Sequence, residues 1–108
     1  MNEQKARRIV RDRSGGLCEV CSSAVGREWH HRKNRSQGGL WSPENGLHVC
    51  SPHHRWITEH PASSWIKGWS VRGSGDPAIA PVFMARYGYV LLTSDGGLIQ
   101  TSRTAEAL

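Results

Sequence analysis

Residues 27–56, REWHHRKNRSQGGLWSPENGLHVCSPHHRW, determine the fold of this 108-residue chain. They hold five of its six histidines, in two adjacent pairs and at His48. REWHH and GLHVC indicate short strands, and the largely polar stretch of 14 residues between them, with Gly38, Gly39 and Pro43, indicates a loop. Ser51 as N-cap and Pro52 at the first helical position predict a helix over SPHHRWITEH. The segment therefore predicts a strand, a long loop, a strand and a helix.

The cysteines occur at spacings that suit a metal. Cys18 and Cys21 form a CxxC pair, and Cys50 with His53 gives a second pair at the same spacing. Three thiolates and one imidazole have the number and type of ligands that structural Zn²⁺ takes. The 28 residues between the pairs must then form a hairpin that brings them together. The sequence predicts a structural zinc site, and the alternative is that the three cysteines are plain thiols.

The two members of each histidine pair are expected to have different roles. Successive helical residues diverge by about 100°, so His53 and His54 would serve two ions on different sides of one helix. His54 would face the first strand and meet His30 or His31 there. Two or three nitrogens with open positions are typical of a catalytic divalent metal. On an ideal strand His30 and His31 point to opposite faces, so both reach one site only if the strand ends or bulges there.

This ordered set of motifs resembles the HNH nucleases, which have the ββα-metal (His-Me finger) fold. The resemblance covers residues 17–59 and rests on CxxC, WHH before a basic loop, RSQGG, PEN, and LHVC leading into SPHHRWI. It is similar to the small phage-type endonucleases, and HHRKNRSQGG is similar to a stretch of colicin-type DNases. With the flanking segments, it implies an α+β fold in which a zinc-stabilised ββα-metal core carries an N-terminal basic helix and a C-terminal β-hairpin extension.

The resemblance also implies roles for four residues. His31 matches the general base that deprotonates the attacking water, and Asn45 matches the N of the family name. In the family that asparagine orients the base through the loop or binds the metal. His30 and His54 match the ligands of the catalytic divalent metal.

Two positions depart from the family pattern. His53 stands where many members have a zinc-binding cysteine, and histidine is also an accepted zinc ligand. Thr58 stands where members often have another metal-binding histidine. The catalytic metal would then have two imidazole ligands, which suits Mn²⁺, Ni²⁺ or Co²⁺ better than Mg²⁺.

The charge of the chain favours a nucleic acid as partner, and the alternative is an ordinary solvated surface. The net charge is +5, and basic residues cluster near the N-terminus and again after the first histidine pair. Such a balance favours a polyanion through phosphate neutralisation. Arg32, Lys33 and Arg35 are expected to hold phosphates beside the site, reading backbone shape with little sequence specificity. No apolar run approaches the length of about 18 residues that indicates a membrane span.

The rest of the chain is expected to frame this core as one domain. Residues 1–60 would form the nuclease core with its N-terminal helix, which Gly15 and Gly16 end. Residues 61–108 would add a short helix ending at Gly68, a strand over SVRG, a β-hairpin or three-stranded meander, and a loose tail. This extension is expected to brace the helix, widen the DNA-contacting surface or mediate a homodimer.

The reading as a whole is a metal-dependent DNA endonuclease. An odd number of cysteines without an apolar leader favours a reducing, cytoplasmic location. For a phage protein, the resemblance implies the host cytoplasm and a partner in DNA packaging. The alternatives are a non-catalytic, zinc-stabilised nucleic-acid-binding module and a protein-interaction knuckle. His48 and His60 are predicted to be a strand surface residue and a helix-end residue, and the five tryptophans to be mainly core residues.

Overall fold

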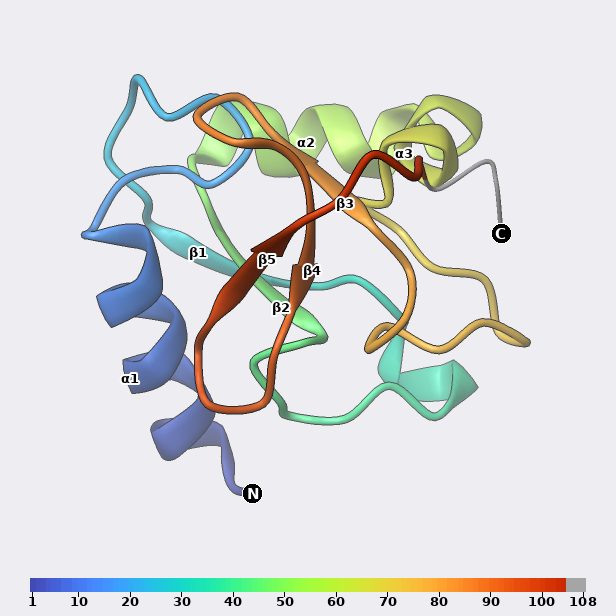
Figure 1. The fold of residues 1–108 in the computed structure, drawn as a ribbon, viewed down its shortest axis with the longest axis horizontal. Helices are drawn as coiled ribbons and strands as arrows, with labels where there is room; N and C mark the ends of the chain where they lie inside the picture. The colour runs from blue at the N-terminus through green and yellow to red at the C-terminus, as the bar shows by residue number, and fades with distance from the viewer. Residues whose placement is uncertain (105–108) are drawn as a thin grey trace.

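The computed structural model describes residues 1–104, and Figure 1 shows how its elements are arranged. Within this range, three α-helices and two small antiparallel sheets form an α+β fold, which confirms the predicted class. No helix in the described range is long and apolar enough to cross a membrane. The elements are α1 (Glu3–Ser14), β1 (Glu28–His31), η1 (Arg35–Gln37), β2 (Gly46–Val49), α2 (Ser51–Glu59), α3 (Pro61–Lys67), β3 (Val82–Met84), β4 (Gly88–Leu92) and β5 (Leu98–Gln100).

The histidine-rich segment folds in the predicted order. Strands β1 and β2 pair antiparallel, with Trp29 opposite His48 and His30 opposite Leu47, and α2 follows directly. One detail differs from the prediction, because Cys50 is the N-cap and Ser51 is already the first helical residue. The chain from β1 to α2 is therefore the strand–loop–strand–helix unit that carries both histidine pairs.

Helix α1 forms where the basic N-terminal segment predicts it. The Asn2 side chain accepts a hydrogen bond from the Lys5 backbone N–H and caps the first turn. Gly15 ends the helix in the left-handed region, at φ 63°, where glycine is favoured. Ala6 and Val10 are buried, and the helix packs against β2. Four basic residues of α1 are therefore exposed, namely Lys5, Arg7, Arg8 and Arg11, whereas Arg13 points into the protein.

A buried ion pair fixes α1 to the hairpin. The Arg13 guanidinium donates two hydrogen bonds to the Glu19 carboxylate, and the two side chains are 1% and 4% exposed. Arg13 also donates to the carbonyls of Pro43 and Gly46, while Glu19 accepts from the His48 backbone N–H. Every charge of the pair is thus bonded inside the protein, which a buried ion pair requires.

The C-terminal part contains the predicted short helix and the predicted three-stranded meander. Helix α3 begins at Pro61 and ends at Gly68, and β3, β4 and β5 pair in sequence order. The predicted strand over residues 70–73 is wrong. Val71 donates its N–H to the Arg32 carbonyl at 2.8 Å, but the chain then turns and forms no ladder. Residues 101–104 form no helix or strand, and the remainder of the predicted loose tail lies outside the described residues.

One hydrophobic cluster joins the two parts of the chain. Buried residues of the hairpin, of α2 and of the three-stranded sheet all belong to it. In Figure 1 the three-stranded sheet lies over the hairpin, with α2 along one edge. The buried apolar members of the cluster are Cys18, Val20, Leu47, Val49, Cys50, Ile57, Trp69, Val82, Met84, Val90 and Leu92.

Candidate functional site

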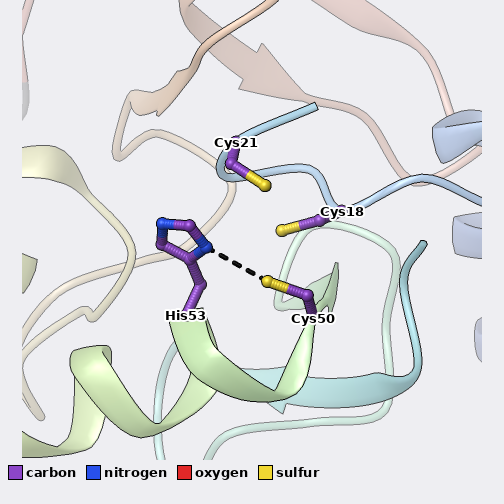
Figure 2. A group of neighbouring side chains, drawn as sticks. All are labelled: Cys18, Cys21, Cys50 and His53. Carbon is purple, nitrogen blue, oxygen red and sulfur yellow. Dashed lines mark hydrogen bonds between the residues drawn. The ribbon is translucent and has the colours of Figure 1, made fainter. Parts of the chain in front are cut away.

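The predicted zinc ligands converge where the N-terminal turn meets the start of α2. Their ligand atoms all lie within 4.8 Å of one another, and the Cys50 Sγ lies 3.1 Å from the His53 Nδ1. Figure 2 shows the three sulfurs and the imidazole directed toward a common centre. The donors have the type and tetrahedral number that zinc prefers. The cluster of Cys18, Cys21, Cys50 and His53 can therefore hold a metal ion such as zinc.

Local backbone structure positions these four ligands. The Cys18 N–H donates to the Ala24 carbonyl, and Ser22 has a left-handed φ of 59°, so the CxxC segment closes into a tight turn. Cys50 leaves the end of β2 and caps α2, which places His53 one helical turn further on. Burial raises the pKa of the Cys18 thiol to about 11. Because a metal ligand must be a thiolate, binding at Cys18 would release a proton.

His30 and His54 lie side by side between β1 and α2. Their ring centroids are 5.2 Å apart. The His54 Nδ1 lies 2.7 Å from Glu28 Oε1, and the Ser51 hydroxyl donates to Glu28 Oε2 at 2.6 Å. The His30 Nε2 lies 2.7 Å from the Trp69 carbonyl oxygen. As neutral imidazoles, both rings therefore donate one N–H to the protein and keep one nitrogen for a ligand.

The charges around this pair suit a cation. Burial lowers the pKa of His30 to about 4, although the Trp69 carbonyl acts in the opposite direction. The hydrogen bond from Ser51, followed by that from His54, lowers the pKa of Glu28. His30 is thus neutral and Glu28 ionised at physiological pH. Within residues 1–104, only the cysteine–histidine cluster brings three or more possible metal ligands within 4.8 Å of one another. The site at His30 and His54 offers two imidazoles, with the Glu28 carboxylate nearby.

His31 lies on the opposite face of β1 from His30. Its Nδ1 accepts a hydrogen bond from the Trp29 indole N–H at 2.8 Å, and its ring meets Trp41 edge-on with centroids 4.5 Å apart. Its Nε2 is buried and has no hydrogen-bond partner among the described residues. Burial and the charges of Arg35 and Arg7 lower its pKa. The structure thus separates His31 from the His30–His54 pair, as strand alternation requires.

Asn45 ties the two ends of the long loop together. Its side chain is 1% exposed. The Oδ1 accepts from the Lys33 N–H at 2.7 Å, and the Nδ2 donates to the carbonyls of Lys33 and Leu40, each at 3.1 Å. All of its polar capacity is directed at the backbone of the loop that follows His31. Asn45 is therefore placed as a positioning residue.

The structure corrects the prediction that Arg32 holds phosphate. Its side chain is 1% exposed, and its guanidinium donates to four carbonyl oxygens, of Gly68, Glu44, Pro77 and Ala80. Burial lowers its pKa to about 9. A guanidinium that is buried and donates four of its five N–H groups inside the protein cannot reach DNA. Arg32 instead fixes the segment after α3 to the end of the hairpin.

The two other predicted phosphate ligands remain near the surface. Lys33 is half-buried and donates from Nζ to the Gly75 carbonyl at 3.0 Å. Arg35 is exposed, with its Cζ 6.0 Å from the centre of the Trp41 ring. Arg7 of α1 covers the same ring at 5.0 Å. Arg7 and Arg35 therefore flank the aromatic cluster that contains His31.

The remaining histidines and Thr58 take no part in the two clusters. His48, predicted at the surface, is half-buried and bonded to the Ser14 hydroxyl at 3.0 Å. His60 lies at the end of α2 as predicted, stacked on Trp56. Thr58 is exposed and donates its hydroxyl to the His54 carbonyl. No imidazole therefore occupies the position one turn after His54.

Sequence reasoning missed Glu28 and Trp69. Glu28 precedes His30 by two residues, so it shares a strand face with it, and strand periodicity could have pointed to it. Trp69 acts through its main-chain carbonyl, for which the sequence carries no signal. No family model matches this chain, and neither a curated protein nor a solved structure matches it. Function is therefore inferred from the residues and their geometry.

Proposed function

We propose that this chain is a metal-dependent HNH-type endonuclease that hydrolyses DNA phosphodiester bonds with little sequence specificity. The observation that carries the proposal is the placement of the His30 and His54 rings 5.2 Å apart, with Glu28 bonded to His54. Two imidazoles and a carboxylate between a hairpin and a helix are donors for a divalent cation. The net charge of +5 supports a polyanionic substrate.

In the proposed enzyme His30 and His54 hold the divalent cation. A bound Mg²⁺, Mn²⁺ or Ni²⁺ would neutralise charge on the scissile phosphate and assist the leaving oxygen. The Trp69 carbonyl and the Glu28 carboxylate each accept a ring N–H and so fix the tautomer of one ligand. The cysteine–histidine zinc site holds the start of α2, and thereby His54, in place.

His31 is the proposed general base, as the family resemblance implies. Because its ring lies on the opposite face of β1 from His30, the end of the strand at His31 must rearrange before the ring can reach a water at the cation. In the described conformation its Nδ1 accepts the Trp29 N–H, so this bond must open before the nitrogen can take a proton from water. Arg7 and Arg35 lie beside the same aromatic cluster and supply positive charge for phosphates. Asn45 holds the loop that leaves His31.

Plasmid cleavage tests the proposal. Zinc-loaded protein should nick supercoiled DNA with Mg²⁺, Mn²⁺ or Ni²⁺ added separately. His31→Ala should lower the rate at least about 100-fold, because a positioned acid–base group contributes that much. His54→Ala should also lower the rate strongly, because it removes a ligand of the proposed cation. His60→Ala removes an exposed imidazole near the same helix and is the matched control. Absence of nicking with all three metals, from folded and zinc-loaded protein, would contradict the proposal.

The second candidate function is a non-catalytic, zinc-stabilised nucleic-acid-binding module. Two observations favour it, namely the enclosed position of His31 and the hydroxyl of Thr58 where the family often has an imidazole. Cleavage that persists unchanged in both His31→Ala and His54→Ala preparations would come from a contaminating nuclease. That result, combined with intact DNA binding, would support this second function.

A further inference from the structure

A groove on the C-terminal side of the proposed site has no role in the mechanism above. It is a cavity of about 820 Å³ between α3 and residues 68–80, and we call it the α3 groove. This volume is within the range of about 300–1,000 Å³ that small-molecule pockets have. The groove shares Trp65 and Arg72 with a second cavity of about 300 Å³ that reaches His30 and Thr58. A ligand in the groove would therefore lie next to the cavity that reaches His30.

Trp65 and Arg72 form an exposed aromatic–cation pair at this junction. The Arg72 Cζ lies 4.1 Å from the centre of the Trp65 ring, close enough for a cation–π contact. The Trp65 residue is 39% exposed, and Arg72 is also exposed. Among residues 1–104, Arg72 forms no ion pair, so its charge is available to a ligand. Ile66 and Ile79, both exposed, add apolar walls to the groove.

We propose that Trp65 and Arg72 bind an unpaired nucleobase of the DNA strand next to the scissile phosphate. The inference rests on the proposed nuclease function for its choice of ligand. Aromatic rings and guanidinium planes are the surfaces on which single-stranded bases stack, whatever their identity. The Arg72 charge complements the adjacent phosphate, and the apolar walls favour a flat, weakly hydrated ring.

The site selects single-stranded over duplex DNA. A paired base is stacked on both faces inside a duplex, so it can enter the groove only after unstacking, which costs free energy. An unpaired base in a flap, gap or loop enters without that cost. The substrate class indicated is thus DNA with an unpaired segment beside the cleaved bond.

Binding of a fluorescent oligodeoxythymidine tests this inference. Anisotropy is measured for zinc-loaded protein without other divalent metal, at one fixed salt concentration, and compared with the matching duplex. Trp65→Ala should weaken single-strand binding by about 5- to 100-fold, and Trp65→Phe should retain most of it. Arg72→Ala should also weaken it. Arg86→Ala removes an arginine that covers Tyr87 at 5.4 Å, away from the groove, and controls for charge.

The outcomes separate this site from the nuclease proposal. Equal losses for Arg72→Ala and Arg86→Ala, or equal losses of single-strand and duplex binding for Trp65→Ala, would overturn the inference. Arg72→Ala decides the matter if Trp65→Ala does not fold, because Arg72 is exposed. Selective loss of single-strand binding from a protein that never cleaves DNA would support the base site and contradict the nuclease. Cleavage that all of these substitutions leave unchanged, together with unchanged single-strand binding, would support the nuclease and contradict the base site.

Discussion

The carbonyl oxygen of Trp69 lies 2.7 Å from the Nε2 of His30. His30 belongs to the histidine-rich hairpin, whereas Trp69 follows α3, so a residue of the C-terminal part holds a predicted metal ligand. The indole N–H of Trp69 donates to the Phe83 carbonyl, and its ring meets Trp56 edge-on. The contacts of the Trp69 side chain with Phe83 and Trp56 therefore hold its carbonyl in place beside His30. The C-terminal part completes the candidate site as well as covering the core.

Removal of zinc should unfold the protein. The cluster joins the N-terminal turn to α2, and two of its cysteines, Cys18 and Cys50, are in the hydrophobic core. Structural zinc contributes about 10–16 kcal/mol of apparent binding free energy in small domains, which is as large as the stability of a whole domain. Circular dichroism during titration with a chelator should show loss of helix, reversed by added Zn²⁺. Retention of the native spectrum in fully metal-free protein would contradict a structural role.

The buried Arg13–Glu19 pair should dominate the electrostatic contribution to stability. Glu19→Gln removes the charge that the Arg13 guanidinium faces at 2.7 Å, with both side chains under 5% exposed. Breaking such a pair typically costs about 3–5 kcal/mol, because an unpaired charge stays buried. Glu3→Gln is the matched control, since Glu3 pairs with Arg7 at 2.8 Å but is half exposed. Exposed helical pairs contribute about 0.5 kcal/mol or less. Urea unfolding of both variants measures the difference, and equal midpoints would contradict the expectation.

Arg32 and Arg35 should separate stability from DNA binding. Arg32→Met leaves four backbone carbonyls without their donor and should lower the free energy of unfolding by at least about 2 kcal/mol, because each buried acceptor left unsatisfied costs about 1–3 kcal/mol. Arg35→Met removes an exposed charge, so its effect on stability should be within about 0.5 kcal/mol. Its effect on DNA binding should be a smaller salt dependence, by roughly one counterion. Urea unfolding and salt-dependent anisotropy measure the two effects. A stable Arg32→Met protein with a reduced salt slope would restore the original prediction.

The spacing of the metal ligands and the alternation of side chains along a strand could be predicted from the sequence. Four metal ligands at two short intervals predict a cluster whatever the details of the fold, and the structure brings them within 4.8 Å. Alternation along β1 also separates His30 from His31, since neighbours on a strand point to opposite faces. Local signals of this kind depend on a few adjacent residues, so the sequence alone contains them.

Hydrogen bonds to main-chain carbonyls far away in the sequence could not be predicted. Arg32 follows a strand and begins a polar loop, which is the pattern of a solvated residue, yet its acceptors include the carbonyls of Pro77 and Ala80. Any residue can supply a carbonyl, so composition gives no sign of such a partner. The same holds for Trp69 and His30. The wrong strand over residues 70–73 has this cause too, because Val71 bonds to Arg32 in place of a sheet neighbour.

Asn45 should control loop order more than zinc binding. Its amide makes three hydrogen bonds to the loop backbone, including the one from the Lys33 N–H. Asn45→Ala leaves the Lys33 carbonyl and N–H without this partner, so the Lys33 amide should exchange faster with solvent, by about tenfold or more. Hydrogen exchange followed by NMR measures this, and zinc content should stay at one per chain. Unchanged exchange at Lys33 would show that the loop is held by other contacts.

Glu28 should set the activity of the proposed nuclease without affecting the stability of the fold. Glu28→Gln keeps the size of the side chain but replaces the carboxylate that accepts from His54 and Ser51 with a neutral amide. Partners of this kind orient a metal-binding imidazole, and their loss typically lowers metal affinity or activity about 10- to 100-fold. Plasmid cleavage at several Mn²⁺ concentrations should show the loss.

Glu59→Gln changes an exposed carboxylate on α2, the helix that carries His54, and is the control for net charge. The thermal midpoint of both variants should match that of the unchanged protein, because the Glu28 side chain is 43% exposed. NMR of the His54 ring supplies a readout independent of cleavage, since loss of the Glu28 acceptor should shift its tautomer. If the tautomer and the cleavage rate both stay the same in Glu28→Gln, the carboxylate does not position His54, and the cation must be held in another way.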